Sequence, residues 1–304
     1  MTGLKGSLNG PMLSLLLGTM FFGLALPFPA QVHVERSQDG KIVVTDQDQG
    51  GQRVYGPQGA TLVFRHREHR LEVFDPSRQA WIAAPADYPM VQAGQQLLLA
   101  SGPGVEGSAV YDLSRHAWVP EFDGYNQGAV SDRFAVGFGG PGRIGLYDAR
   151  TGRWQSPNIT GEEVALSDHL VAFYGPSSNT NLYDAQRDTW MRDFSSFSRC
   201  TLGERIAVFY GPPGNNTMAY DEERATKTTL IEPVDKVVVE GDLAVVVGPR
   251  QHACVFCAED GAWTEYRGDA RHIAVRDGQA MITGSSGDLW IYVPGRRTFE
   301  KIRG

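Results

Sequence analysis

The amino-acid sequence predicts an all-β protein, a seven-bladed β-propeller with four-stranded blades and a repeat of about 36 residues. Three observations predict this fold. An aromatic–acid pair recurs along the chain, an apolar run precedes each copy in the same phase, and a glycine-containing turn signal follows most of these runs. Fixed periods of roughly 20–50 residues are typical of repeat architectures. Residues 31–304 show no sustained 3.6-residue apolar period, so we expect almost no helix.

The first repeated element is an aromatic residue followed by an acid, with a second aromatic residue six positions after the acid. Corresponding positions in successive copies are 36 or 37 residues apart. The last two copies are degenerate, and lysine replaces the second aromatic residue in the fifth. The copies are Phe74-Asp75 with Trp81, Tyr111-Asp112 with Trp118, Tyr147-Asp148 with Trp154, Tyr183-Asp184 with Trp190, Tyr220-Asp221 with Lys227, Phe256-Cys257 with Trp263, and Tyr292-Val293 with Phe299.

Each unit predicts four strands. In the second unit, Val91–Ala93 is a short inner strand, and Leu97–Ala100 is a wholly apolar strand followed by the turn signal Gly102-Pro103. The aromatic–acid pair belongs to the third strand, and the tryptophan begins the fourth and outermost one. Because a single sheet of this kind cannot bury both faces alone, the units are expected to stack radially and fold together.

The first thirty residues predict a secretory signal. Lys5 is their one charge, and an apolar run from Leu13 to Leu26 is shorter than the roughly 20 residues that span a bilayer. Cleavage is expected after Ala25 or Ala30. We therefore predict a secreted or periplasmic protein whose mature chain has no membrane span; the alternative is an uncleaved anchor.

Two regions follow the signal. Residues 31–59 form an N-terminal segment in which Arg53–Tyr55 is expected to be the inner strand of the first blade, with Lys41–Thr45 a candidate added edge strand. Residues 60–304 carry the seven units of the propeller.

The third unit also resembles a known repeat. Tyr147 and Trp154, preceded by the pair Gly139-Gly140, are similar to the diglycine, tyrosine and tryptophan of kelch repeats. Other units have Gly-Pro or Ser-Gly instead, so the chain resembles a divergent kelch-like set over residues 60–304. The resemblance implies that these aromatic and turn residues pack blade against blade. It implies an architecture and no particular function.

Composition excludes some classes of function. The net charge of −7 argues against a nucleic-acid partner. Of three cysteines, Cys254 and Cys257 form a CxxC motif. On an extended strand their Cα atoms would lie about 10 Å apart, beyond the roughly 7 Å limit for a disulfide. We expect buried packing thiols, a redox or metal pair being the alternative, and we predict no cofactor.

Enzymes built on propellers need particular residues at particular positions, and this sequence does not have them there. Quinone-dependent dehydrogenases carry tryptophan eight residues after the aspartate, whereas the distance here is six. Copper radical oxidases need a cysteine crosslinked to a tyrosine and two histidines near the axis, and Cys200 and the scattered histidines offer no match. The sequence favours a protein without catalytic activity and leaves an enzyme open.

A basic hairpin replaces the glycine turn of the first unit. Arg65, His66, Arg67 and His69 surround Glu68 in this segment. Arginine suits a bidentate grip on carboxylate or sulfate groups, so these residues are candidates for contact with an acidic partner. The alternatives are a solvated hairpin tip and a metal held by the two imidazoles and Glu68.

Acids recur in the turns that join the first and second strands. In a propeller these turns surround one mouth of the channel, where Asp132, Asp168, Glu204, Asp242 and Asp277 would hold a structural Ca²⁺. The alternative is turn chemistry, because aspartate is favoured in tight turns. Arginines in the turns before the outer strands are expected to form a solvated rim; they are Arg115, Arg150, Arg153 and Arg187.

The predicted function is an exported, non-catalytic binding scaffold that presents a ligand or protein site on the loops of one propeller face. The loops that leave the apolar strands supply the candidate residues Arg143, Asn179, Asn215, Arg250 and His252. The expected partner is a protein or a glycan, bound by a monomer. The alternative is a carbohydrate-active enzyme or lectin-like module that acts on an extracellular glycan.

Overall fold

The computed structural model describes most of the chain from residue 62 onwards and three strands before it. The described residues are 32–36, 42–46, 51–55, 62–67, 69–75, 77–78, 80–102, 107–121, 124–139, 144–159, 161–175, 179–192, 197–213, 216–230 and 232–303. The predicted signal segment, Arg143 and Asn215 lie outside them. In this part of the chain every regular element is a β-strand, and there is no helix that could span a membrane.

Six antiparallel sheets hold these strands, and neighbouring strands in a sheet also follow one another along the chain. The first sheet contains β1 (Val32–Arg36), β2 (Ile42–Asp46), β3 (Gly51–Tyr55), β4 (Val63–Arg67), β5 (Arg70–Asp75) and β6 (Ala80–Ala83). The second contains β7 (Met90–Ala93), β8 (Leu97–Ser101), β9 (Ser108–Asp112) and β10 (Ala117–Glu121). The third contains β11 (Gln127–Val130), β12 (Phe134–Phe138), β13 (Gly145–Asp148) and β14 (Arg153–Gln155).

The remaining sheets continue the same order. The fourth contains β15 (Glu163–Leu166), β16 (Leu170–Tyr174), β17 (Asn181–Asp184) and β18 (Thr189–Met191). The fifth contains β19 (Phe197–Leu202), β20 (Ile206–Pro213), β21 (Thr217–Asp221) and β22 (Thr226–Leu230). The last contains β23 (Lys236–Glu240), β24 (Leu243–Val247), β25 (His252–Cys257), β26 (Ala262–Arg276), β27 (Gln279–Gly284), β28 (Leu289–Val293) and β29 (Thr298–Arg303).

Burial follows the predicted order of strands within a unit. The second and third strands of the second, third and fourth sheets are buried at every residue, whereas the first and fourth strands are half-buried or exposed. A continuous apolar run is the pattern of a strand covered on both faces. The apolar runs of these three sheets were therefore correctly predicted as strands buried on both faces.

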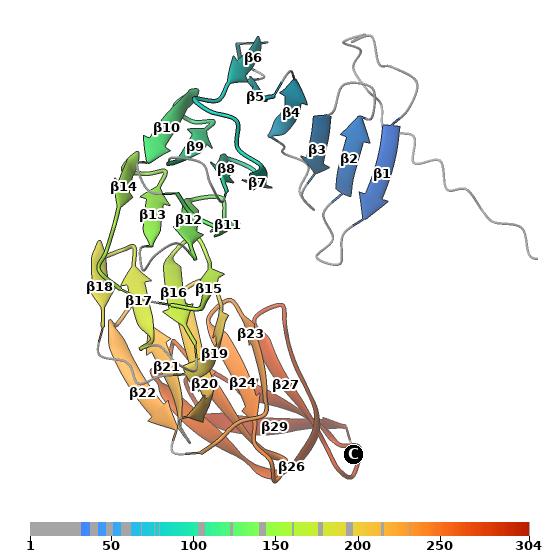
Figure 1. The fold of residues 1–304 in the computed structure, drawn as a ribbon. Helices are drawn as coiled ribbons and strands as arrows, with labels where there is room; N and C mark the ends of the chain where they lie inside the picture. Colours follow the sequence, from blue (N-terminus) through green and yellow to red (C-terminus); the bar gives the residue numbers. More distant parts are fainter. Residues whose placement is uncertain are drawn as a thin grey trace, which may run out of the picture.

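The predicted count of seven blades is not confirmed, because the described residues form six sheets. Strand β26 accounts for the difference. It pairs with β25 from Ala262 to Tyr266 and again at Asp269, and with β27 from Ala270 onwards, so the sixth and seventh repeats share one strand and one sheet. The sheets follow one another along an arc from β1 to β29 (Figure 1).

Hydrophobic clusters join consecutive sheets face to face. One cluster packs Phe64 and Val73 of the first sheet against Leu98 and Tyr111 of the second. Another packs Val208 of the fifth sheet against Val246 of the last. Each sheet therefore buries its faces against its neighbours, as expected for units that cannot fold alone.

The repeated aspartate and tyrosine fasten one sheet to the next. Asp112 accepts hydrogen bonds from the backbone N–H and hydroxyl of Ser114 in its own turn, at 2.9 and 2.6 Å. Its second oxygen accepts from the hydroxyl of Tyr147 in the next sheet at 2.7 Å. The same bond joins Tyr111 to Asp75 at 2.8 Å. The signature aromatic–acid pair is thus explained by packing between units.

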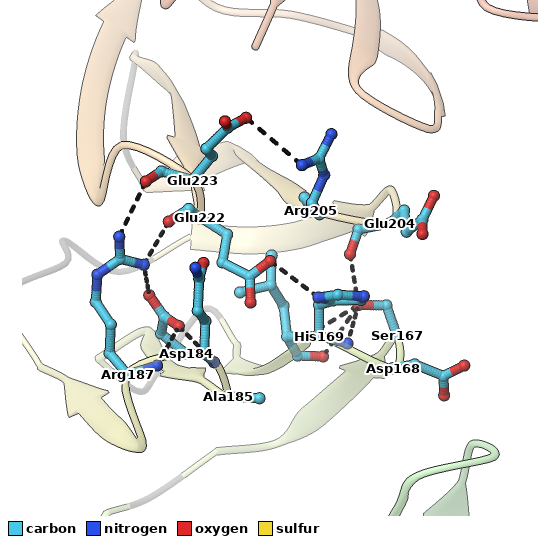
Figure 2. A network of polar contacts seen from close by, with 12 residues as sticks. Ser167, Asp168, His169, Asp184, Ala185, Arg187, Glu204, Arg205, Glu222 and Glu223 are labelled. Carbon is cyan, nitrogen blue, oxygen red and sulfur yellow. Dashed lines mark hydrogen bonds and ion pairs between the residues drawn. The ribbon is translucent and has the colours of Figure 1, made fainter.

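The repeated arginines extend this fastening. The side chains of Arg115, Arg150 and Arg187 are exposed, as expected for a solvated rim, and they also contact the next sheet. Arg187 pairs with Asp184 at 2.8 Å and also donates to the carbonyls of Glu222 and Glu223 in the next sheet (Figure 2). Arg115 donates to the carbonyl of Ala149 at 2.5 Å in the same way. Arg150 donates to the carbonyl of Ala185. The side chain of Arg153 is exposed.

The tryptophans link the outer strands. The indole N–H of Trp154 donates to the carbonyl of Val119 in the preceding sheet at 3.2 Å, and Trp263 donates to Thr228 at the same distance. A half-buried indole needs such an acceptor. Both aromatic positions of the repeat therefore contact a neighbouring sheet.

Candidate functional site

The two edges of each sheet differ in what their turns do. In an antiparallel meander, the turns between strands one and two and between strands three and four lie at one end of the strands. The loop between strands two and three lies at the opposite end. We refer to these two ends as edges of the sheet. The first edge carries the aspartate and arginine contacts, and we call it the fastened edge. The second carries the loops that vary between units, and we call it the loop edge. A ligand site that leaves the fold intact belongs at the loop edge.

A pocket of about 790 Å³ opens at the loop edge of the last sheet. We call it the His252 pocket. Its walls come from the segment before β23, the loop between β24 and β25, and the middle of β26. The charged lining residues are Glu232, Arg250, His252, Glu265, Arg267 and Asp269. Two of the predicted ligand-binding residues, Arg250 and His252, are therefore placed in one pocket.

The imidazole of His252 lies between two carboxylates. Its Nδ1 is 2.7 Å from Oε2 of Glu232, and its Nε2 is 2.7 Å from Oε1 of Glu265. Both carboxylates accept, so both ring nitrogens must carry hydrogen, which is the protonated form. The hydrogen bond to Glu232, followed by that to Glu265, raises the pKa of His252 above its usual 6.5 despite partial burial. At neutral pH this geometry stabilises an imidazolium.

A β-bulge shapes the pocket floor. Ala253 is opposite Tyr266, but His252 is opposite Asp269, so Arg267 and Gly268 are extra residues on β26. The ring of Tyr266 packs against this bulge, and a Cβ at position 268 would lie 3.0 Å from its Cε1. Bulges redirect side chains and are common beside functional sites. This one contributes Arg267 and Asp269, both exposed, to the pocket lining.

The guanidinium groups of Arg250 and Arg267 are unpaired within the described part of the chain. Neither guanidinium forms a hydrogen bond or ion pair with another described residue, and both side chains are exposed. By contrast, Arg187 and Arg115 bridge two sheets. Unengaged guanidinium groups in a pocket are available to bind an anion.

An aromatic groove of about 590 Å³ adjoins the His252 pocket and shares Glu265, Tyr266 and Arg267 with it. Trp290 and Phe299 line its other side. The Tyr266 ring makes edge contacts with both, at centroid distances of 5.8 and 5.3 Å. Strand β26 thus separates a charged pocket from an aromatic one.

The predicted acidic mouth is only partly assembled. Asp132, Asp168 and Glu204 line a pocket of about 540 Å³ at the fastened edge of the third to fifth sheets. Asp242 and Asp277 do not line this pocket: Asp242 pairs with Arg205, and the backbone N–H of Asp277 donates to the carboxylate of Glu240 at 3.3 Å. Among the described residues, no three acidic, histidine or cysteine side chains form a group that could hold a metal ion. The Ca²⁺ site remains a prediction without geometric support.

A buried glutamate contacts a half-buried histidine beside that acidic pocket. Oε2 of Glu222 is 3.0 Å from Nδ1 of His169, which lines the pocket (Figure 2). Glu222 is fully buried, and burial raises the pKa of its carboxyl group. The pair joins the fourth sheet to the fifth, and we interpret it as structural.

Side chains of the basic hairpin of the first unit form contacts with neighbouring residues. Arg65 pairs with Glu72 at 2.6 Å, and its guanidinium lies 4.0 Å from the Trp81 ring centroid. His66 lies 3.4 Å from Asp87, and His69 adopts a positive φ of 62° at the turn. Arg67 also has an interaction partner. These contacts explain the hairpin by local packing.

Asn179 lies apart from the His252 pocket, in the loop before β17, and its side chain is exposed. The cysteines are free thiols; Cys254 and Cys257 are buried on β25. Burial raises the pKa of Cys254 to about 12, so this thiol is unreactive at neutral pH.

Sequence reasoning missed the partners of His252. Glu232 and Glu265 lie 20 and 13 residues away along the chain, outside the repeated signature. No sequence signal pointed to them, because both acids reach His252 through the pairing of β25 with β26 and the chain before β23.

No known protein family and no curated protein matches this sequence. Solved structures with similar folds include BamB from Moraxella catarrhalis, which is 11% identical with a TM-score of 0.37 and 85% and 95% of the two chains covered. Prp20p from Saccharomyces cerevisiae is 7% identical with a TM-score of 0.37 and coverage of 74% and 75%. Hsv2p from Kluyveromyces lactis is 11% identical with a TM-score of 0.33 and coverage of 66% and 71%. We draw no conclusion from likenesses this weak and rely on the strand pairing and contacts described above.

Proposed function

We propose that this protein is an exported, non-catalytic binding scaffold that presents the His252 pocket to a ligand. The observation that carries the proposal is that charged residues at the fastened edge hold the sheets together, whereas charged residues at the loop edge line a pocket. The repeated aspartates, tyrosines and arginines fasten the sheets, whereas Arg250, Arg267 and Asp269 line a pocket and make no ion pair with another described residue. Charged groups without a structural role in a pocket of this size favour binding.

The frame proposed for this scaffold is a seven-bladed, kelch-like propeller. In its support, the last sheet contains two runs of four antiparallel strands that share β26. The tyrosine of the seventh copy also bonds to the preceding unit, where Tyr292 donates to Asp260, a turn aspartate three residues after the signature position Cys257, at 2.5 Å. The proposal of export rests on the apolar segment before residue 31.

Binding to arrays of oligosaccharides and of peptides tests the function. We expect the wild-type protein to bind members of one array, and the double variant Arg250→Ala/Glu265→Ala to lose this binding. Arg276→Ala is the matched control, because Arg276 is exposed on the same strand, beside the turn into β27 at the opposite edge. Binding that survives the double variant, or no binding to either array, would contradict the proposal.

A further inference from the structure

We propose that the His252 pocket binds an acidic sugar, that Arg250 and Arg267 hold its carboxylate, and that the proton on His252 favours this binding. The inference rests on the proposed scaffold function and specifies the ligand of the same site.

The charges of the pocket support an anion. The carboxylates of Glu232 and Glu265 both face His252 at 2.7 Å, so each already has a hydrogen-bond partner within the protein. Two free guanidinium groups and the carboxylate of Asp269 remain. The guanidinium fork matches a carboxylate with two parallel hydrogen bonds, which makes a carboxylate the anion that the two arginines fit well.

The other surfaces of the pocket support a sugar. Asp269 can accept hydrogen bonds from hydroxyl groups beside the arginines. The adjoining aromatic groove offers Trp290 and Phe299 for the apolar face of a second ring. The pocket volume of about 790 Å³ suits one or two sugar rings better than a folded partner. An acidic peptide shares the carboxylate but lacks the dense hydroxyl groups.

The protonation state of His252 changes the net charge around the arginines. With His252 protonated, the pocket holds three positive groups, Arg250, Arg267 and His252, and three negative ones, Glu232, Glu265 and Asp269. When His252 loses the proton, the pocket gains net negative charge. The neutral ring can donate to one carboxylate only, so the other is released to compete for the arginines. Binding of an anion should therefore weaken as pH rises.

Isothermal titration with trigalacturonate tests the ligand class, with a neutral galactose trisaccharide and a triglutamate peptide as comparisons. We expect trigalacturonate to bind at least tenfold more tightly than either at pH 6. Arg250→Gln and Arg267→Gln should each weaken it at least tenfold, and Arg276→Gln should leave it unchanged. These arginines are exposed, so the variants should fold, as their thermal unfolding will show.

The pH profile tests the proton. Affinity of the wild type for trigalacturonate should fall between pH 6 and pH 9, and His252→Gln should flatten this profile. Equal affinity for neutral and acidic trisaccharides, indifference to both arginine variants, or an unchanged profile in His252→Gln would overturn the inference. Preference for the neutral sugar or the peptide, lost in the arginine variants, would overturn it and leave the scaffold standing. A protein that binds nothing on the arrays would contradict both.

Discussion

At the scale of single residues, one buried carboxylate can organise both its own turn and the neighbouring sheet. Asp75 is fully buried, and burial alone would raise its pKa. Hydrogen bonds from Ser77, Tyr111 and the backbone instead hold the pKa of Asp75 well below its usual range. The carboxylate is therefore charged in the folded protein, and it stabilises the fold above pH 4 and loses this effect as the solution becomes more acidic.

Replacing one such tyrosine should weaken the contact between two sheets. Tyr147→Phe removes the 2.7 Å bond to Asp112. We expect the free energy of unfolding to fall by about 1.5–3 kcal/mol, as for a hydrogen bond to a charged group. Tyr210→Phe is the control, because its hydroxyl lies 3.4 Å from Thr201 within one sheet. Equal losses in the two variants, measured by denaturant unfolding, would contradict the fastening role.

The hydrogen bonds of His252 to Glu232 and Glu265 predict that the stability of the fold depends on pH. The pKa of His252 is raised in the folded state, so its contribution is fully present below pH 6.5 and is lost as pH rises through the folded-state pKa. We expect the stability difference between the wild type and His252→Gln to shrink from pH 6 to pH 9. Thermal unfolding across this range measures it, and a difference that grows with pH would show that the imidazole is neutral.

At the scale of elements, close packing explains a glycine inside a strand. The buried ring of Tyr125 lies over Gly137 of β12, where an added Cβ would be 2.1 Å from the ring. We expect Gly137→Ala to destabilise the fold by about 1–3 kcal/mol through overpacking. In the background of Tyr125→Ala the same change should cost much less. A double-mutant cycle by denaturant unfolding measures the coupling, and additive effects would contradict it.

The strands could be predicted from the sequence because apolar runs and the aromatic–acid pair repeat locally. Leu97–Ala100, for example, lies inside the buried strand β8. The hydrogen bonds from Arg115 and Arg187 to the next sheet could not be predicted, because the sequence does not show which backbone carbonyl lies opposite an arginine in a turn. The hydrogen bonds of His252 depend on the register of β25 against β26 and on a bulge, which no residue pattern specified.

At the scale of the whole molecule, the account implies a ring that closes when its end sheets meet. These sheets contain β1 and β29, which lie at the two ends of the arc (Figure 1). A compact chain of this length should have a radius of gyration of about 19 Å. Small-angle scattering of the protein should give a value near this, and a clearly larger radius would indicate an open arc.

The location of binding is the central claim, and hydrogen exchange tests it directly. The protein would be measured with and without the tightest binder from the arrays. We expect protection of the loop from Gly248 to His252 and of β26 around Tyr266, with no change at the turns of the fastened edge. Protection confined to the turn at Asp112 or Asp184 would contradict the account, because those aspartates would then serve a ligand as well as the fold.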